Sequence, residues 1–368
     1  MKKVIYFVSE DWVFVNHRIE IAKKIQKKGF KVILVTNVSD HKKLIEKNNI
    51  KVIPIKIKRG SLNIRKSIRV IYKLIKIYKN VKPDIVHNFG IRQIIHSNIA
   101  AQISNIKKTY NSIIGLGSVF ISSNFLIKFL VINALRLTLF FKNSKVLVQN
   151  KDDYNFLKKK IWVSEKNLHI NTVSGINLKN FNTSKEPKGK IIFLFASRIL
   201  KDKGIVELIE ASRKLRKINK NFELFIAGSI DSQNPSSIFY EQIKAWDAED
   251  YIKYLGHIEN INDLYKKVHI AILPSYREGL PRGLLEAGAC AKPIITTNVP
   301  GCRDVVIDGK NGITVTPRDS EELFLAMKKM VQNKKMRLSM GKEGRNFIKK
   351  NFLIDYSIKN LINLYKSS

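Results

Sequence analysis

Two pairs of charged side chains each follow a short apolar run of the sequence. Glu278 and Glu286 lie eight residues apart after one such run, and Arg198 and Lys203 follow another. An arginine can bind a phosphate group through two hydrogen bonds and a lysine adds a point charge, so this pair suits a diphosphate. A shielded carboxylate needs hydrogen-bond donors, which sugar hydroxyls supply. The four residues together suit a ligand that carries both phosphate and sugar.

The segment around Glu278 also predicts a helix N-terminus. Residues 282–289 have helical periodicity, and Pro281 suits the first turn of a helix. This N-terminus would direct partial positive charge at an anion. Gly279 and Gly283 allow the backbone to approach a ligand closely. The second glutamate lies one turn into the helix among apolar neighbours, so we expect it to be shielded from solvent.

Short apolar strands alternate with helical segments along the chain. Strands are predicted at 4–8, 31–36, 51–55, 84–87, 108–111 and 145–149, and again at 191–196, 223–227, 251–254, 269–273 and 293–296. This alternation indicates βαβ units and parallel sheets. Ligands of such sheets bind beyond the carboxyl ends of the strands. Arg198, Lys203 and Glu278 are predicted to lie in loops of that kind, and Glu286 lies in the helix that follows one of them.

A polar stretch, Lys185–Lys190, separates two rounds of this alternation and has the Pro and Gly content of a linker. A length of 368 residues also suits two domains. We therefore predict an α/β chain of two facing Rossmann-like, doubly wound domains with a deep cleft between them. They are placed at 1–183 and 190–345, and terminal helices at 346–368 are expected to pack back on the first domain.

The chain is strongly basic, with 67 Lys and Arg against 30 Asp and Glu and a net charge of +37. Such a surface favours anionic partners such as a membrane or phosphorylated ligands. A composition rich in Lys, Ile and Asn would raise the charge without any functional cause. Nucleic-acid binding predicts aromatic residues among the basic ones. Because only Tyr72 and Tyr78 occur between residues 51 and 82, we expect no nucleic-acid partner.

Residues 119–141 are apolar and long enough to span a bilayer. Lys128 and Arg136 would be costly at the bilayer centre, so we expect a buried or interfacial helix instead. The apolar run at the N-terminus is too short for a signal peptide and is interpreted as a first strand. Cys290 and Cys302 do not form a disulfide framework, which favours a cytoplasmic location.

Several motifs, in order along the chain, resemble those of family 4 retaining glycosyltransferases, which have the two-domain GT-B architecture. They are Gln149-Asn150 with Asp153, Ser174-Gly-Ile-Asn177 with Phe181, Ser197-Arg-x4-Lys-Gly204, Leu255-Gly256, Glu278-x7-Glu286 after Pro274-Ser, Val299–Val305 and Asp308-Gly-x-Asn-Gly312. The resemblance covers essentially the whole chain. It implies a nucleotide-sugar donor bound by the second domain.

The resemblance also assigns roles to residues of this sequence. It implies that Arg198 and Lys203 neutralise the donor diphosphate, and that Glu286 holds the ribose hydroxyls. Glu278 would contact the donor sugar and the positive charge that develops at its anomeric carbon. Backbone N–H groups of Gly283 and Leu284 would hold the distal phosphate. Further donor contacts are assigned to Gly279 and Leu280, and no metal or cofactor is expected because the cations and the helix dipole replace one.

A narrower resemblance concerns the acceptor. Gly115-Leu-Gly117-Ser-Val-Phe is similar to bacterial enzymes of capsule, O-antigen and N-glycan assembly that extend undecaprenyl-diphosphate-linked sugars. Many family members carry a His in this loop, which this chain lacks. The loop expected at 9–18 also lacks the family's paired glycines, so Asn16 and His17, with Arg18, are assigned to acceptor phosphates. His87, at the end of a predicted strand, is a further cleft candidate.

These assignments predict an enzyme of one class. It would move a hexose or N-acetylhexosamine, with retention, from a nucleotide sugar to a polyprenyl-diphosphate-linked or other surface-glycan acceptor. The resemblance favours UDP as the nucleotide. The basic first half and the apolar segment predict a peripheral position on the inner face of the cytoplasmic membrane. A sugar-nucleotide epimerase on the same scaffold is the alternative.

Overall fold

The computed structural model describes residues 1–57, 63–116, 124–141, 144–170 and 174–367. It divides the chain into two compact units, each built on one parallel sheet. The first unit contains Met1–Ser174 together with Ile354–Ser368, and the second contains Gly175–Leu353. The segment that follows Ser174 is tied to the second unit, because Ile176 donates its N–H to the carbonyl of Phe352 at 2.8 Å.

The sheet of the first unit has the strand order β3-β2-β1-β4-β5-β6-β7, and all its pairs are parallel. The strands β2 and β3 lie on one side of β1, and β4 to β7 follow on its other side. The strand order therefore reverses between β1 and β4. Both faces of the sheet are covered, which explains why the central strands β4 and β5 are buried along their whole length. The strands are β1 (Lys2–Glu10), β2 (Phe30–Asn37), β3 (Lys51–Pro54), β4 (Ile85–Phe89), β5 (Thr109–Ile113), β6 (Ser144–Val148) and β7 (Leu168–Ile170).

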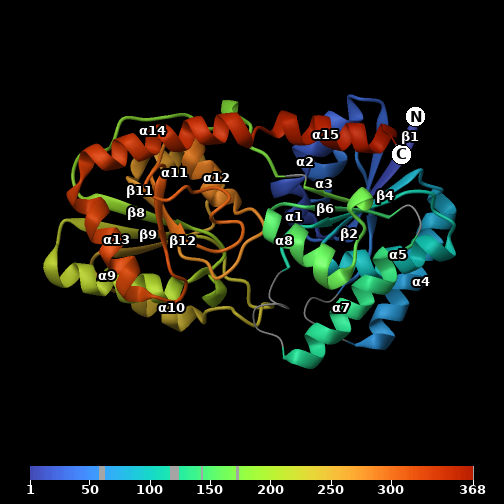
Figure 1. Cartoon of the computed structure of the whole chain (residues 1–368), viewed down its shortest axis with the longest axis horizontal. Coiled ribbons are helices and arrows are strands. Elements are labelled where there is room, and N and C mark those ends of the chain that lie inside the picture. Colours follow the sequence, from blue (N-terminus) through green and yellow to red (C-terminus); the bar gives the residue numbers. More distant parts are fainter. Residues whose placement is uncertain (58–62, 117–123, 142–143, 171–173, 368) are drawn as a thin grey trace. The chain divides into compact units, whose positions relative to one another are not determined.

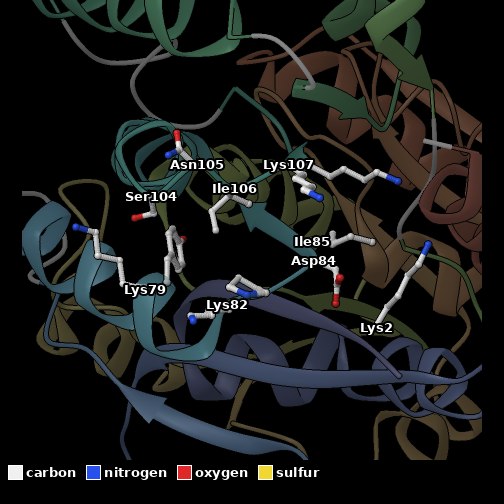
Figure 2. Close-up of a pocket in the computed structure, with 12 residues that line it drawn as sticks. Lys2, Lys79, Lys82, Asp84, Ile85, Ser104, Asn105, Ile106 and Lys107 are labelled. Carbon is white, nitrogen blue, oxygen red and sulfur yellow. The ribbon is translucent and has the colours of Figure 1, made fainter.

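Helices cover this sheet on both sides (Figure 1). One apolar cluster joins the sheet to α2 and α15, and another joins its opposite face to α4 and α5. At the amino ends of β1 and β4, a hollow opens beside the C-terminal ends of α4 and α5 (Figure 2). The helices are α1 (Asp11–His17), α2 (Ile19–Gln26), α3 (Lys42–Glu46), α4 (Ile64–Val81), α5 (Ile91–Ile103), α7 (Phe125–Leu139), α8 (Lys151–Phe156) and α15 (Ile354–Ser367).

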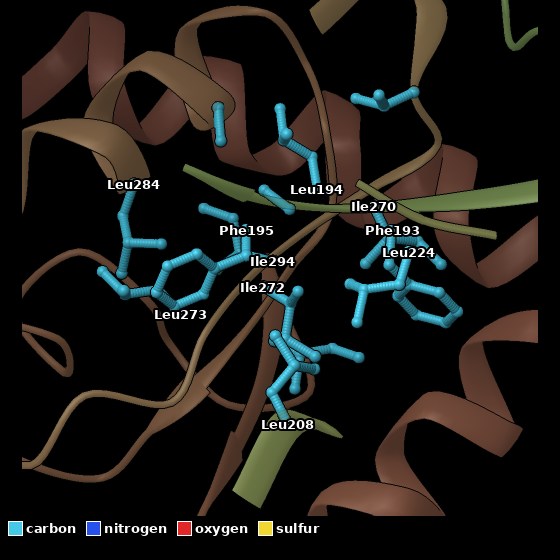
Figure 3. Packing of buried hydrophobic residues seen from close by; sticks show 14 of the residues in the cluster. Phe193, Leu194, Phe195, Leu208, Leu224, Ile270, Ile272, Leu273, Leu284 and Ile294 are labelled. Carbon is cyan, nitrogen blue, oxygen red and sulfur yellow. The ribbon is translucent and has the colours of Figure 1, made fainter. Parts of the chain in front are cut away.

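The second unit repeats the architecture with the strand order β10-β9-β8-β11-β12-β13. Its core contains Phe193 and Phe195 of β8, Leu273 of β11 and Leu284 of α12 (Figure 3). The strands are β8 (Ile191–Ala196), β9 (Phe222–Ala227), β10 (Ile252–Gly256), β11 (Ile270–Leu273), β12 (Ile294–Thr297) and β13 (Gly312–Val315). The helices are α9 (Ile205–Ile218), α10 (Tyr240–Asp247), α11 (Ile261–Lys267), α12 (Arg282–Ala289), α13 (Ser320–Gln332) and α14 (Lys334–Asn351).

These two doubly wound sheets confirm the predicted fold class, but one expected loop is a helix. Residues 11–17 form α1 where a loop was predicted at 9–18. The reason is local packing. Phe14 contacts the ring of Tyr6 at 6.3 Å between centroids, and the buried carboxylate of Asp11 accepts hydrogen bonds from the backbone and hydroxyl of Ser39. An amphipathic turn therefore continues directly from β1.

The apolar segment predicted at 119–141 contains α7, and residues 117–123 lie outside the described part of the chain. Burial is confined to the C-terminal turns of α7, where Leu135 and Leu139 pack in a cluster with β6. The expectation of a buried helix is therefore wrong for its N-terminal half. Across the described residues, we find no helix with the length and apolarity needed to cross a membrane.

Candidate active site

The loop that follows β8 carries both basic residues predicted for phosphate binding. The ammonium of Lys203 forms a close ion pair with the carboxylate of Glu278, and only 14% and 13% of the two side chains are exposed. Arg198 is 40% exposed, and its guanidinium donates to the carboxylate of Asp231 at 2.8 Å. The structure thus brings Lys203 and Glu278 together, and it adds Asp231, which sequence analysis missed.

Backbone contacts hold this loop against the loop that carries Glu278. The N–H of Tyr276 donates to the carbonyl of Asp202 at 2.9 Å, and the hydroxyl of Ser275 donates to the same carbonyl at 3.1 Å. Gly204 has a φ of +71°, and a Cβ there would lie 2.0 Å from the carbonyl oxygen of Pro274. Only glycine fits this position without strain, so Lys203 is held beside Glu278 by the backbone itself.

The helix predicted beside Glu278 is α12, and it begins at the predicted residue. Pro281 is its N-cap rather than a residue of its first turn. A Cβ at Gly283 would lie 2.8 Å from the carbonyl oxygen of Ala196, so the first turn of α12 lies against the end of β8. The N–H of Leu284 donates to the carbonyl of Pro281 at 3.1 Å, so this donor is engaged within the turn.

Glu286 lies one turn into α12 with 12% of its side chain exposed. Burial raises the pKa of the Glu286 carboxyl, and the positive charge of Arg282 opposes that rise. The Nε of Arg282 donates to this carboxylate at 2.7 Å. Sequence analysis missed Arg282, although its i,i+4 spacing from Glu286 on a predicted helix was a sufficient signal.

The two remaining predicted donor residues are buried. Gly279 lies at the base of the loop, and Leu280 belongs to the apolar core of the second unit. The predicted motif at 299–305 contacts the backbone of the loop that contains Glu278. The N–H of Glu278 donates to the carbonyl of Pro300 at 3.1 Å, and a Cβ at Gly301 would lie 2.6 Å from the carbonyl oxygen of Glu278. This motif therefore positions the glutamate loop.

In the first unit, the predicted acceptor residues follow β1 and β5. Asn16 is exposed and His17 is half-buried at the end of α1. Gly115 follows β5 with a φ of +105°, and Gly117 lies outside the described residues. All three described residues lie in segments beyond the carboxyl ends of their strands, as ligand-binding positions do in this class of sheet.

His87 is a core residue rather than a ligand-binding one, so its prediction as a cleft candidate is wrong. Its side chain is fully buried, and burial together with the charge of Arg18 holds the pKa of the imidazole well below its ordinary value. One ring nitrogen contacts the hydroxyl of Tyr365 at 2.5 Å, and the other contacts that of Ser112 at 2.7 Å. The imidazole thus joins α15 to the sheet.

Metal ligands do not cluster in the described part of the chain, where we find no group of three or more His, Cys, Asp or Glu side chains placed to hold an ion. The loop after β8 instead carries Arg198 and Lys203, and the segment from Glu278 to Glu286 carries two glutamates and Arg282. This arrangement offers cations for an anionic ligand and carboxylates for hydroxyl groups, which is the chemistry required to bind a nucleotide sugar.

Comparison with protein families places both units in one class. Residues 177–347 match the family described as glycosyl transferases group 1, and residues 3–150 match the family described as glycosyl transferase 4-like. The chain therefore belongs to the glycosyltransferases, with a 4-like first domain and a group 1 second domain. This confirms the resemblance that the motifs indicated.

Individual relatives agree with this classification. The chain is 26% identical over 359 residues to N,N'-diacetylbacillosaminyl-diphospho-undecaprenol alpha-1,3-N-acetylgalactosaminyltransferase from Campylobacter jejuni, a match that covers 92% of each chain. It is 27% identical to the capsular polysaccharide biosynthesis glycosyltransferase CapM from Staphylococcus aureus, over 47% of this chain and 45% of CapM. The crystal structure of Anabaena HepE with UDP and glucose covers 100% of both chains with a TM-score of 0.82 and 16% identity, which shows the shared fold.

Proposed function

We propose that this protein transfers a hexose or N-acetylhexosamine, with retention, from a UDP-sugar to a polyprenyl-diphosphate-linked or other surface-glycan acceptor. The observation that carries the proposal is the shielded Lys203–Glu278 pair beside the N-terminus of α12. Support for the acceptor comes from the Campylobacter relative, whose name includes a diphospho-undecaprenol substrate. None of the relatives named above is an epimerase, so that alternative gains no support from them.

The proposed chemistry follows from the charges in the second unit. When the bond between the anomeric carbon and the phosphate oxygen breaks, negative charge develops on the departing diphosphate and positive charge on the sugar. The ammonium of Lys203 and the guanidinium of Arg198 stabilise the negative charge on the diphosphate. The carboxylate of Glu278 stabilises the positive charge on the sugar. The positive end of the α12 dipole adds to the stabilisation of the diphosphate.

A panel of nucleotide sugars tests this donor assignment. We expect one or more UDP-sugars to raise the thermal unfolding midpoint, because a ligand that binds only the folded state stabilises it. Stabilisation by GDP-sugars alone would contradict the UDP assignment. Incubation of the stabilising sugar without an acceptor distinguishes the alternative reaction, since isomerised nucleotide sugar would identify an epimerase.

Donor binding is expected to weaken at mildly acidic pH because of Glu286. Its pKa is raised by burial, so protonation begins above the usual range of a glutamate and removes an acceptor for the ribose hydroxyls. Glu286→Gln is expected to weaken UDP binding about tenfold at neutral pH. The variant should then show only the pH dependence of UDP itself, which calorimetric titration between pH 5 and 8 measures. Equal pH profiles for the two proteins would disprove this role.

The apolar side chains on α7 and α4 support a peripheral position on the cytoplasmic membrane surface. Both helices run back from the carboxyl edge of the first sheet, and a group of exposed apolar residues lies in their N-terminal halves. Basic neighbours Arg65, Lys66, Arg69 and Lys128 make this face suitable for an anionic leaflet. The group contains Phe125, Leu126, Phe129 and Leu130 of α7 and Ile64 and Ile68 of α4, each at least 52% exposed.

Removing two of these side chains is expected to reduce membrane binding. Phe129→Ser with Leu130→Ser should lower the affinity for phosphatidylglycerol-containing vesicles at least about tenfold, because less apolar surface enters the bilayer. Co-sedimentation measures the bound fraction. Leu325→Ser with Leu338→Ser is the matched control, because these residues of the second unit are 52% and 51% exposed. An equal loss in both variants would contradict docking through α7.

A further inference from the structure

A hollow of about 650 Å³ lies at the amino ends of the strands in the first unit (Figure 2). Its lining includes Lys2 and Ile85, the first residues of β1 and β4, and Lys108, which directly precedes β5. The strands are parallel, so this edge of the sheet is opposite the edge where the acceptor residues lie. The hollow contains none of the residues proposed for donor or acceptor binding.

Positive charge dominates the lining. Lys79 and Lys82 come from the end of α4 and Lys107 from the loop before β5, and two further lysines come from the strand edges. Asp84 is the acidic lining residue, and its carboxylate already accepts the N–H of Lys3 at 2.7 Å. Within the described part of the chain, none of the five lining lysines forms an ion pair. Some lysines elsewhere in the unit are paired, as Lys24 is with Asp355.

The negative C-terminal ends of two helices offset part of this positive charge, but not all of it. The C-terminal ends of α4 and α5 lie at the hollow, and each helix end carries roughly half a negative charge. Together with Asp84 they offset about two of the five positive charges. About three remain, and like charges around one hollow repel each other. A multiply charged anion would relieve that repulsion.

The size and lining of the hollow suit a small soluble ligand better than a membrane. The volume is within the range of small-molecule sites. None of the lining residues is an exposed large apolar side chain, which a bilayer contact would require.

We propose that this hollow binds a soluble small anion that carries two or more phosphate groups. The lysines from α4, from the loop before β5 and from the strand edges supply the charge that holds such an anion. Such a site is separate from sugar transfer, so it does not depend on the function proposed above. The ligand class follows from the excess of about three positive charges, which one phosphate would not neutralise at neutral pH.

Titration of inorganic tripolyphosphate by calorimetry tests the site. The parent protein in this experiment is the Lys203→Ala variant, which lacks one cation of the proposed donor site. Both triple variants are made in this parent. Adding Lys79→Gln, Lys82→Gln and Lys107→Gln is expected to weaken binding about tenfold or more. The matched control replaces Lys23, Lys27 and Lys47, which line a second hollow of about 580 Å³ in the same unit. We expect this control to bind within about twofold of the parent.

Three results would overturn the proposal. Tripolyphosphate could fail to bind the parent protein, or both triple variants could lose affinity equally, as a diffuse charge effect requires. The third result concerns vesicles that contain phosphatidylglycerol. If the first triple variant loses vesicle binding while tripolyphosphate binding is unchanged, the lysines serve a membrane surface instead. Circular dichroism of each variant verifies that the exposed substitutions leave the fold intact.

Discussion

Replacing Glu278 with glutamine is expected to lower the rate of sugar transfer at least about 100-fold, and Lys203→Ala is expected to have an effect of similar size. The carboxylate and the ammonium are both shielded from water, where charge acts more strongly on a developing charge. Gln keeps the shape of Glu278 but loses its charge, so the change in rate reports electrostatics. Initial rates with the UDP-sugar that stabilises the protein measure the effect.

Glu223→Gln is the matched control for this experiment. Glu223 belongs to the same unit, is 15% exposed and pairs with Lys253 at 2.9 Å, but it lies on β9 away from α12. We expect this control to keep nearly full activity. If Glu278→Gln and Lys203→Ala also keep full activity, the proposed catalytic roles are wrong. A loss in all three variants would instead indicate damage to the second unit.

The substitution Gly204→Ala is expected to destabilise the second unit by about 3 kcal/mol or more, because it adds a backbone clash to an unfavourable φ. The added Cβ would lie 2.0 Å from the carbonyl oxygen of Pro274, and neither group can move without shifting its loop. For a unit of this size, we expect a fall of roughly 6–12 °C in the thermal midpoint. Activity should fall with it, since Lys203 moves with the loop.

Gly309→Ala separates the two causes. Gly309 has a φ of +70°, against +71° at Gly204, but a Cβ there would meet no atom within 4 Å. The control therefore measures the backbone cost alone, which we expect to be about 1 kcal/mol. Thermal unfolding of both variants gives the difference. Equal shifts would show that the contact with Pro274 contributes nothing.

Sequence patterns predicted the elements that position the proposed donor site. The strand β8 and the helix α12 have the predicted bounds, because one is a continuous apolar run and the other begins after a proline. The contact between Arg198 and Asp231 was not predictable, since it joins two loops whose approach depends on strand order. The strands β7 and β13 were also missed, because they are short and lie at sheet edges.

The first unit was harder to predict because its polar residues serve packing. His87 follows the same strand-end pattern as a ligand-binding residue, yet it lies in the core. Its partner Tyr365 is 278 residues away in the sequence, so no local pattern could reveal the pairing. The division of α7 into an exposed and a buried half was not predictable for a related reason. Apolar residues predict burial only when a second apolar surface is available to cover them.

The contribution of α15 to the first unit also has a consequence for biosynthesis. Tyr365 of this helix packs with Tyr110 and His87, and the hydroxyl of Tyr110 donates to the carbonyl of Leu364. The ribosome completes the whole second unit before it releases residues 354–367. Domains generally fold as they emerge during translation. The first unit is therefore synthesised first but cannot complete its core until the end of the chain is released, so the unfinished core must be protected from aggregation.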